Sequence, residues 1–293
     1  MILVVGATGL VGSEVCSILS GGGHQVRALT RSTSDPGKKE RLTQLGATCV
    51  EGDLKDPDSL TRACEGVEAV VTTASATLDR QDGDSLQTVD HEGQLALVGA
   101  AIGTGVKKFV HVSVPLFEGL DIPLGTAKRA VEDRLYESSL DYTVLRPNYF
   151  MEVWLGAALG FDHSNAKVTI YGEGNNPLSW VSFRDVAAVA AKAVSHEYCR
   201  KGTFDLGGDP ISPNDVIATF ERVSGRTFEV TRMPHADLKA QFEQAEDPLQ
   251  KTFCGLMYAY SQGVPMDSAG LLEALGHTLT TVEDYARAAS TAS

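Results

Sequence analysis

The stretch Ile2-Leu3-Val4-Val5-Gly6-Ala7-Thr8-Gly9-Leu10-Val11-Gly12 decides the fold of this chain. Its apolar start predicts a buried strand, and the residues from Leu10 onward have the pattern of a helix. Gly6 permits the tight turn between them, Gly9 lets a pyrophosphate approach the backbone, and Gly12 lets the helix pack closely. The N–H groups at a helix N-terminus attract anions, so we predict a dinucleotide-binding cradle. A purely structural turn is the alternative.

The context of this stretch favours the cradle, because short apolar strands alternate with helices through the first half of the chain. We predict strands at Ile2–Val5, Gln25–Thr30, Thr48–Glu51, Ala69–Thr73, Phe109–Val112, Tyr142–Arg146 and Thr203–Leu206. We predict helices at Leu10–Ser20, Pro57–Cys64, Val89–Gly103, Thr126–Ser139, Asp185–Ser195, Ser212–Ser224, His235–Gln244 and Pro248–Ser261. This order predicts an α/β fold, a Rossmann doubly wound parallel sheet with a smaller C-terminal α/β lobe.

The end of the second strand indicates which dinucleotide the cradle takes. An NAD site places an acid there, whereas this chain has Arg31, followed by Ser32. A guanidinium suits the 2′-phosphate of NADP, and we therefore favour NADP. A solvated surface arginine is the alternative for Arg31. Asp53, after the third strand, is expected to accept a hydrogen bond from the adenine amino group, while Asp56 or Asp58 caps the next helix.

The amino-acid composition indicates which classes of binding partner to expect. The 293 residues carry a formal charge of −13, which repels nucleic acid and anionic lipid surfaces. We therefore expect a small-molecule substrate or effector, no nucleic acid and no membrane. The strand at the N-terminus leaves no room for a targeting peptide, so we expect a cytoplasmic protein. Five scattered cysteines without C-x-x-C spacing predict free thiols and no metal site.

These motifs resemble the atypical short-chain dehydrogenase/reductases, and within them the NmrA-like and NAD(P)H-binding quinone-reductase-like group. The resemblance rests on Gly6–Gly12, Val26–Arg31, Gly52-Asp53, Val89–Gly93, Gly105–Ser113, Lys128 with Glu132, Leu145–Asn148, Trp180–Ser182 and Asp185–Ala187. It implies NADP across the carboxyl edge of the sheet, with residues 1–150 as the NADP-binding domain, 180–208 returning to it, and 151–293 forming most of a substrate lobe. A homodimer is common among related folds.

The cofactor contacts that we expect combine the cradle with positions implied by the resemblance. They are Gly6, Thr8, Gly9, Leu10, Val11, Gly12, Arg31, Ser32, Asp53, Leu54, Thr73, Ala74, Ser75, Val112, Ser113, Lys128, Pro147, Asn148, Tyr149 and Phe150. The expected substrate pocket contains Pro115, Met151, Trp154 and Trp180. Ordinary core packing explains the apolar run after Phe150 equally well.

The chain departs from the resemblance at the catalytic pair. Typical members place a tyrosine four residues before the lysine, but Leu124 stands four residues before Lys128, and Pro115 stands where a substrate-facing serine is usual. Lys128 is expected to bind ribose hydroxyls, with an ion pair to Glu132 as the alternative. Lys128 and Tyr149 are the candidate catalytic residues, and packing is an equal alternative for Tyr149.

Two further groups, His111 and Tyr171, are weaker candidates for proton transfer, and His111 is better explained as a hydrogen-bonded core histidine. Two functions remain. The first is an NADPH-dependent oxidoreductase acting on a small, largely apolar carbonyl, quinone, imine or enone. The second is a non-catalytic NADP(H)-binding sensor or assembly protein, which the absent tyrosine favours.

Overall fold

The computed structural model describes residues 1–291 and divides the chain into two units. Within the described residues, the first unit comprises 1–114, 124–146 and 186–204, and the second comprises 115–123, 147–185 and 205–291. Residues 292–293 of the predicted lobe lie outside the described part. The helices of residues 1–291 fall short of the length and apolarity needed to span a bilayer. The five cysteines are free thiols.

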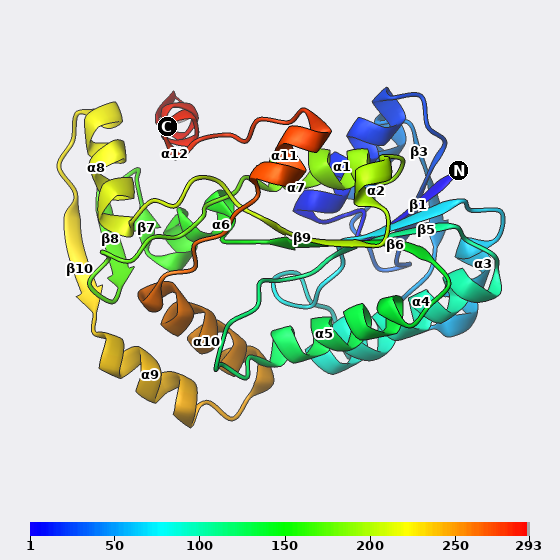
Figure 1. The fold of residues 1–293 in the computed structure, drawn as a ribbon, viewed down its shortest axis with the longest axis horizontal. Helices are drawn as coiled ribbons and strands as arrows, with labels where there is room; N and C mark the ends of the chain where they lie inside the picture. Colours follow the sequence, from blue (N-terminus) through cyan, green and yellow to red (C-terminus); the bar gives the residue numbers. More distant parts are fainter. Residues whose placement is uncertain (292–293) are drawn as a thin grey trace. The chain divides into compact units, whose positions relative to one another are not determined.

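The first unit contains most of a seven-stranded sheet, ordered β3-β2-β1-β4-β5-β6-β9 (Figure 1). The strands are β1 (Ile2–Val5), β2 (Val26–Thr30), β3 (Ala47–Glu51), β4 (Ala69–Thr72), β5 (Lys108–Val112), β6 (Asp141–Pro147) and β9 (Gly202–Leu206). The pairs from β3 to β6 are all parallel. Because the order runs outward in both directions from β1 and β4, the sheet has a topological switch point between these strands. This confirms the predicted α/β doubly wound fold.

The helices of this unit are α1 (Leu10–Gly21), α2 (Pro36–Gln44), α3 (Pro57–Cys64), the π-helix η1 (Leu86–Gly93), α4 (Gln94–Gly103), α5 (Pro123–Tyr136), α7 (Phe183–Ala193) and the 3-10 turn η3 (Glu197–Cys199). Figure 1 shows α3, α4 and α5 along one face of the sheet. Leu3, Val70 and Phe109 lie side by side on β1, β4 and β5, and they join one buried cluster with Leu97 of α4 and Val131 of α5. Removing this apolar surface from water is the main force that holds the layers together.

Two predicted helices begin three residues earlier in the structure. The helix predicted at Thr126–Ser139 begins at Pro123, which suits the first helical turn because proline has no N–H to satisfy there. The helix predicted at Val89–Gly103 instead begins at Leu86 as a π-helix that continues into α4. A capping box between Ser85 and Thr88 starts it earlier than the apolar pattern indicated.

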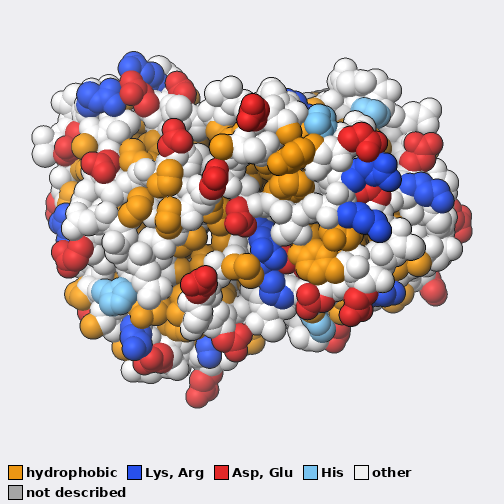
Figure 2. Space-filling model, viewed as in Figure 1, with side chains coloured by type: hydrophobic (Ala, Val, Ile, Leu, Met, Phe, Trp, Pro, Cys, Tyr) orange, Lys and Arg blue, Asp and Glu red, His pale blue; other side chains and the backbone are white. Residues whose placement is uncertain are grey.

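The second unit has its own small sheet, ordered β10-β8-β7, made of β7 (Phe161–Asp162), β8 (Lys167–Tyr171) and β10 (Glu229–Met233). Its helices are α6 (Met151–Trp154), η2 (Ala157–Leu159), α8 (Pro213–Ser224), α9 (His235–Gln244), α10 (Pro248–Gln262), α11 (Ala269–Leu275) and α12 (Val282–Thr291). Acidic and basic side chains are interspersed among the described residues on the molecular face shown in Figure 2.

Candidate functional site

The glycine turn after β1 has the geometry that the sequence predicted. Gly6 adopts φ +81°, and the Gly9 N–H donates to its carbonyl at 3.0 Å. A Cβ on Gly12 would lie 2.1 Å from the Gly6 oxygen, so only glycine fits this first turn of α1. Among the described residues no side chain caps α1, and no acid stands in its first turn. The helix therefore presents N–H groups that suit an anion.

The turn faces the end of β4. A Cβ on Gly6 would meet the Ala74 nitrogen at 2.7 Å, and the Thr73 N–H donates to the Val5 carbonyl at 2.9 Å. The carboxyl ends of β1 and β4 therefore meet at the switch point, where ligands bind in open α/β sheets.

A cavity opens at this edge of the first unit. It is lined by Val5, Gly6, Thr8, Gly9, Leu29, Arg31, Ser34, Gly52, Asp53, Leu54, Thr73, Ala74, Ser75, Asp79, Asp84 and Val89. Nine residues of the predicted cofactor set are in this lining, from the glycine turn to Ser75. Within the described chain, the other eleven are not in it, namely Leu10, Val11, Gly12, Ser32, Val112, Ser113, Lys128, Pro147, Asn148, Tyr149 and Phe150.

At the end of β2, the hydroxyl that accompanies Arg31 is Ser34 rather than Ser32. Ser32 is exposed, whereas Ser34 lines the cavity and its hydroxyl accepts a hydrogen bond from the Arg31 N–H at 3.0 Å. The chain turns tightly after β2, with the Ser34 N–H bonded to the Arg31 carbonyl, and this turn directs the third residue inward. Of these two serines, Ser34 is therefore the one in the cavity lining.

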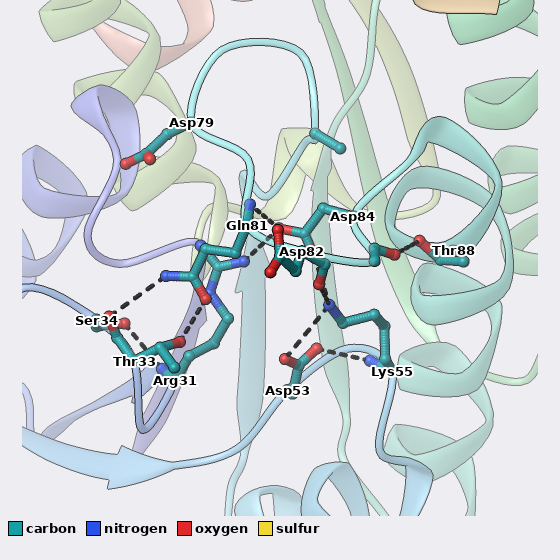
Figure 3. A network of polar contacts seen from close by, with 12 residues as sticks. Arg31, Thr33, Ser34, Asp53, Lys55, Asp79, Gln81, Asp82, Asp84 and Thr88 are labelled. Atoms are coloured by element: carbon teal, nitrogen blue, oxygen red, sulfur yellow. Dashed lines mark hydrogen bonds and ion pairs between the residues drawn. The ribbon is translucent and has the colours of Figure 1, made fainter.

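Arg31 is not a solvated surface arginine, because it belongs to a polar network (Figure 3). Its Nη1 lies 2.5 Å from Asp84 Oδ2, and Lys55 Nζ lies 2.6 Å from Asp84 Oδ1. Although burial opposes the shift, hydrogen bonds from Lys55, the Gln81 N–H and Arg31 lower the pKa of Asp84. Asp84 is therefore an anion at neutral pH.

Asp53 also lines the cavity, and Asp56 is the residue that caps α3, accepting from the N–H groups of Asp58 and Ser59. Asp53 accepts from the Lys55 N–H at 2.9 Å and keeps its side chain 32% exposed. Its carboxylate can therefore accept a further hydrogen bond from a ligand.

The ion pair between Lys128 and Glu132, which was the alternative to ribose binding, does not form. Lys128 Nζ lies 3.2 Å from Asp90 Oδ1 and donates to the Ala74 carbonyl at 3.2 Å. Asp90, fully buried on the π-helix, also accepts from the Ala76 N–H at 2.9 Å. The Lys128–Asp90 pair thus fixes the backbone of the cavity wall, because Lys128 bonds the Ala74 carbonyl and Asp90 bonds the Ala76 N–H.

Glu132 instead lies at the centre of a separate buried cluster. It lies 2.5 Å from Arg146 Nη2 and 2.7 Å from Arg129 Nη2, and it accepts a hydrogen bond from the Ser113 hydroxyl at 2.6 Å. The Ser113 hydroxyl also accepts from Arg129 at 2.7 Å. The Ser113 hydroxyl therefore forms its hydrogen bonds inside this buried cluster, to Glu132 and Arg129.

His111 is buried, as predicted, but it is not a satisfied core histidine. Among the described residues neither ring nitrogen has a hydrogen-bond partner. Burial, together with the charges of Lys128 and Arg129, holds the pKa of His111 well below its ordinary value. The imidazole is therefore neutral at physiological pH.

In the second unit, Tyr149 forms part of an aromatic cluster. Its ring lies 4.7 Å from Trp154 and 5.7 Å from Tyr260, and its hydroxyl donates to the Leu256 carbonyl at 2.8 Å. Burial raises the pKa of Tyr149 well above its ordinary value. This geometry favours the packing alternative for Tyr149. Tyr171 is similarly engaged, because its hydroxyl donates to the Leu159 carbonyl.

The residues predicted for the substrate pocket all belong to the second unit and are buried, namely Pro115, Met151, Trp154 and Trp180. Trp180 lines an open cavity of about 630 Å³ whose other lining residues come mainly from 207–211, 266–269 and 277–283. Asn148 donates to the Val264 carbonyl, while its buried Oδ1 has no partner among the described residues.

Sequence reasoning missed Ser34, Asp79, Asp84 and Asp90. Asp90 lay within a quoted motif and could have been suspected as the partner of a buried lysine. The other three lie in irregular segments, where no periodicity indicates which side chain turns inward.

Comparisons with known proteins agree with the fold. Residues 1–286 match the sequence model of the NmrA-like family. The chain is 30% identical to the photosystem II assembly factor Ycf39 of Synechocystis sp., over 97% of this chain and 89% of that protein. It is 27% identical to quinone oxidoreductase 2 of Escherichia coli, over 97% of this chain and 96% of that protein.

A solved structure supports the same fold. The NADPH-dependent quinone oxidoreductase QOR2 from Escherichia coli, crystallised with NADPH, matches with a TM-score of 0.80 over 99% of each chain, at 23% identity.

Proposed function

The chain belongs to the NmrA-like family, and on that premise we propose that it is an NADPH-dependent oxidoreductase reducing a small, largely apolar carbonyl, quinone, imine or enone. The observation that carries the proposal is the cavity at the switch point, which combines the glycine turn with Arg31 at the end of β2. The near-full-length similarity to a quinone oxidoreductase supports hydride transfer.

The residues of this cavity fit NADPH. The turn from Gly6 to Gly12 leaves no room for a Cβ at either end and so suits the approach of a pyrophosphate. Arg31 and Ser34 suit the 2′-phosphate, because a guanidinium and a hydroxyl are good donors to phosphate oxygens. Asp53 suits the adenine amino group.

When bound, the cofactor supplies a hydride. We propose that Lys128 contributes by holding the wall at Ala74 rather than by moving a proton, because Asp90 and the Ala74 carbonyl already engage its ammonium group. A quinone, imine or activated alkene can take its proton from water. We also propose that the second unit selects the substrate.

A second candidate function is a non-catalytic NADP(H)-binding sensor or assembly protein. The observation that favours it is Leu124, a buried residue in the first turn of α5 where related enzymes carry the catalytic tyrosine. The 30% identity to a photosystem II assembly factor supports it as well.

One experiment separates these functions. NADPH oxidation is followed by the loss of nicotinamide absorbance against a panel of quinones, aldehydes, imines and enones, with calorimetric binding of NADPH alongside. Turnover with any acceptor, with a KM for NADPH that rises in Arg31→Ala, supports the enzyme. Binding of NADPH without turnover across the panel favours the sensor, and no binding would refute both.

A further inference from the structure

Asp84, which lines the cavity, forms ion pairs with two cationic side chains, Arg31 and Lys55. Its carboxylate contacts Arg31 through one oxygen and Lys55 through the other, at 2.5 and 2.6 Å. The side chain is 2% exposed, compared with 25% for Arg31 and 28% for Lys55. The ion pairs therefore have little solvent around the anion, and solvent screens them less than it screens a surface pair.

The carboxylate is also held by its own chain. The Gln81 N–H donates to Asp84 Oδ2 at 2.9 Å, and the Asp84 N–H donates to the Gln81 carbonyl at 3.0 Å. Gly83 between them adopts φ +78°, which closes the turn. Asp84 is thus positioned against Arg31 by local hydrogen bonds and by the start of η1 at Ser85.

The segment that carries Asp84 also contacts the loop after β2 and the first turn of α2. Gln81 bonds Thr33 through their side chains, and Asp79 pairs with Lys38 at 2.9 Å. Figure 3 shows Arg31, Thr33 and Ser34 on one side of this network and Gln81 and Asp84 on the other. The carboxylate consequently stays beside the guanidinium without depending on one contact alone.

We propose that Asp84 determines cofactor selectivity, because its carboxylate competes with the 2′-phosphate of NADPH for Arg31. This inference rests on the proposed function. A phosphate that uses Arg31 must displace the carboxylate or lie beside it, and like charges at such separation repel. NADH has a neutral 2′-hydroxyl at this position and meets no such competition. Asp84 therefore lowers the ratio of the NADPH affinity to the NADH affinity below the value that Arg31 alone would give.

The test is the Asp84→Asn variant, which keeps the size of the side chain and removes its charge. We expect the Kd of NADPH to fall about tenfold or more, the lower end of what a charge-assisted hydrogen bond contributes. We expect the Kd of NADH to change by less than about twofold, because its 2′-hydroxyl carries no charge for Asp84 to repel. Asp82→Asn is the matched control, since it makes the same charge change at an exposed position two residues away. It should leave both Kd values within about twofold.

The opposite role, in which Asp84 orients Arg31 for the phosphate, predicts weaker NADPH binding in Asp84→Asn. That result, or an unchanged ratio of the two Kd values, would overturn the proposal. In the Arg31→Ala background, Asp84→Asn should increase NADPH affinity by a smaller factor, because the guanidinium for which the carboxylate and the phosphate compete is absent. Asp84→Ser provides the same test with a smaller side chain if the asparagine variant does not fold.

Failure of the inference is distinguishable from failure of the proposed function. If the wild-type protein binds both nucleotides and the ratio is insensitive to Asp84, only the inference is wrong. If the wild-type protein binds neither nucleotide, the proposed function is wrong and the inference fails with it.

Discussion

Gly12→Ala is the sharpest test of the cradle, because the structure gives the size of the conflict. The added Cβ would lie 2.1 Å from the Gly6 oxygen and 2.7 Å from its carbonyl carbon. Ordinary contact begins near 3.4 Å, so the turn or the helix must move by 3.4 − 2.1 = 1.3 Å. Both atoms that must move belong to the backbone, and no side-chain rotation can relieve the overlap.

We expect Gly12→Ala to lower the free energy of unfolding by about 1–3 kcal/mol, the usual cost of forcing extra volume into a packed site. NADPH should bind about tenfold more weakly or worse, because the N–H groups that meet the pyrophosphate shift with the turn. Urea unfolding and calorimetric titration measure the two effects.

Gly99→Ala is the matched control. Gly99 is an exposed position within α4, and nothing lies within 4 Å of the Cβ that alanine would add. The substitution should raise the free energy of unfolding by about 0.5–1 kcal/mol and leave NADPH binding unchanged. Wild-type stability and wild-type NADPH affinity in Gly12→Ala would refute the argument for the cradle.

Three further predictions concern other residues. Arg31→Ala should weaken NADPH by about tenfold or more and NADH far less, because only NADPH loses a charge-assisted contact; equal losses in calorimetric titrations would contradict the assignment. Tyr149→Phe should lower stability by about 1 kcal/mol through loss of the hydrogen bond to Leu256, with NADPH-dependent turnover retained; turnover abolished in a folded variant would instead make Tyr149 the proton donor. The third prediction concerns Asp185. Burial opposes ionisation of Asp185, but hydrogen bonds from His277 and Thr280 outweigh it and lower the pKa of the carboxyl. Its stabilising contribution is therefore present above the unfolded pKa of about 3.9 and is lost as the pH falls through the lower folded value. The difference in urea midpoint between wild type and Asp185→Asn should shrink below about pH 4, and parallel pH profiles would show that folding does not lower the pKa of Asp185.

The sheet was predictable because its strands are short, apolar and separated by glycine or polar breaks. The predicted strands Ile2–Val5 and Phe109–Val112 agree with β1 and β5 to within one residue. The cradle was predictable for the same local reason, since its glycines are adjacent in sequence to the strand and the helix that they join.

Helices and strands that lack a periodic pattern of apolar residues could not be predicted from the sequence. The helix α2 buries only Leu42, and its start depends on a cap from Asp35 and on Pro36. The strand β10 is mostly exposed or half-buried, so it carries little hydrophobic signal. Both elements are stabilised by caps or by neighbouring strands rather than by a core-facing pattern.

The charged partners in the candidate site could not be predicted either. Arg31 and Asp84 are 53 residues apart in sequence, and the segment that carries Asp84 has no regular structure. The i, i+4 spacing suggested Glu132 as the partner of Lys128, but Asp90 on the π-helix took that place. Local spacing gives only a list of neighbours. Glu132 and Asp90 are both buried, and Glu132 is paired with Arg129 and Arg146, which come from two different elements.

The buried pair of Lys128 and Asp90 has a consequence for altering the cavity. The lysine holds the carbonyl of Ala74 and the aspartate holds the N–H of Ala76, so this wall is anchored through its peptide groups. The side chain of Ala74 packs against the core cluster, so of these residues Ser75 is the position at which a side chain can be exchanged while the course of the chain stays constant. A designer who wishes to reshape the cavity would therefore begin at Ser75, whereas a change at Asp90 would remove the hydrogen bond to Ala76 and the ion pair to Lys128 that hold this wall.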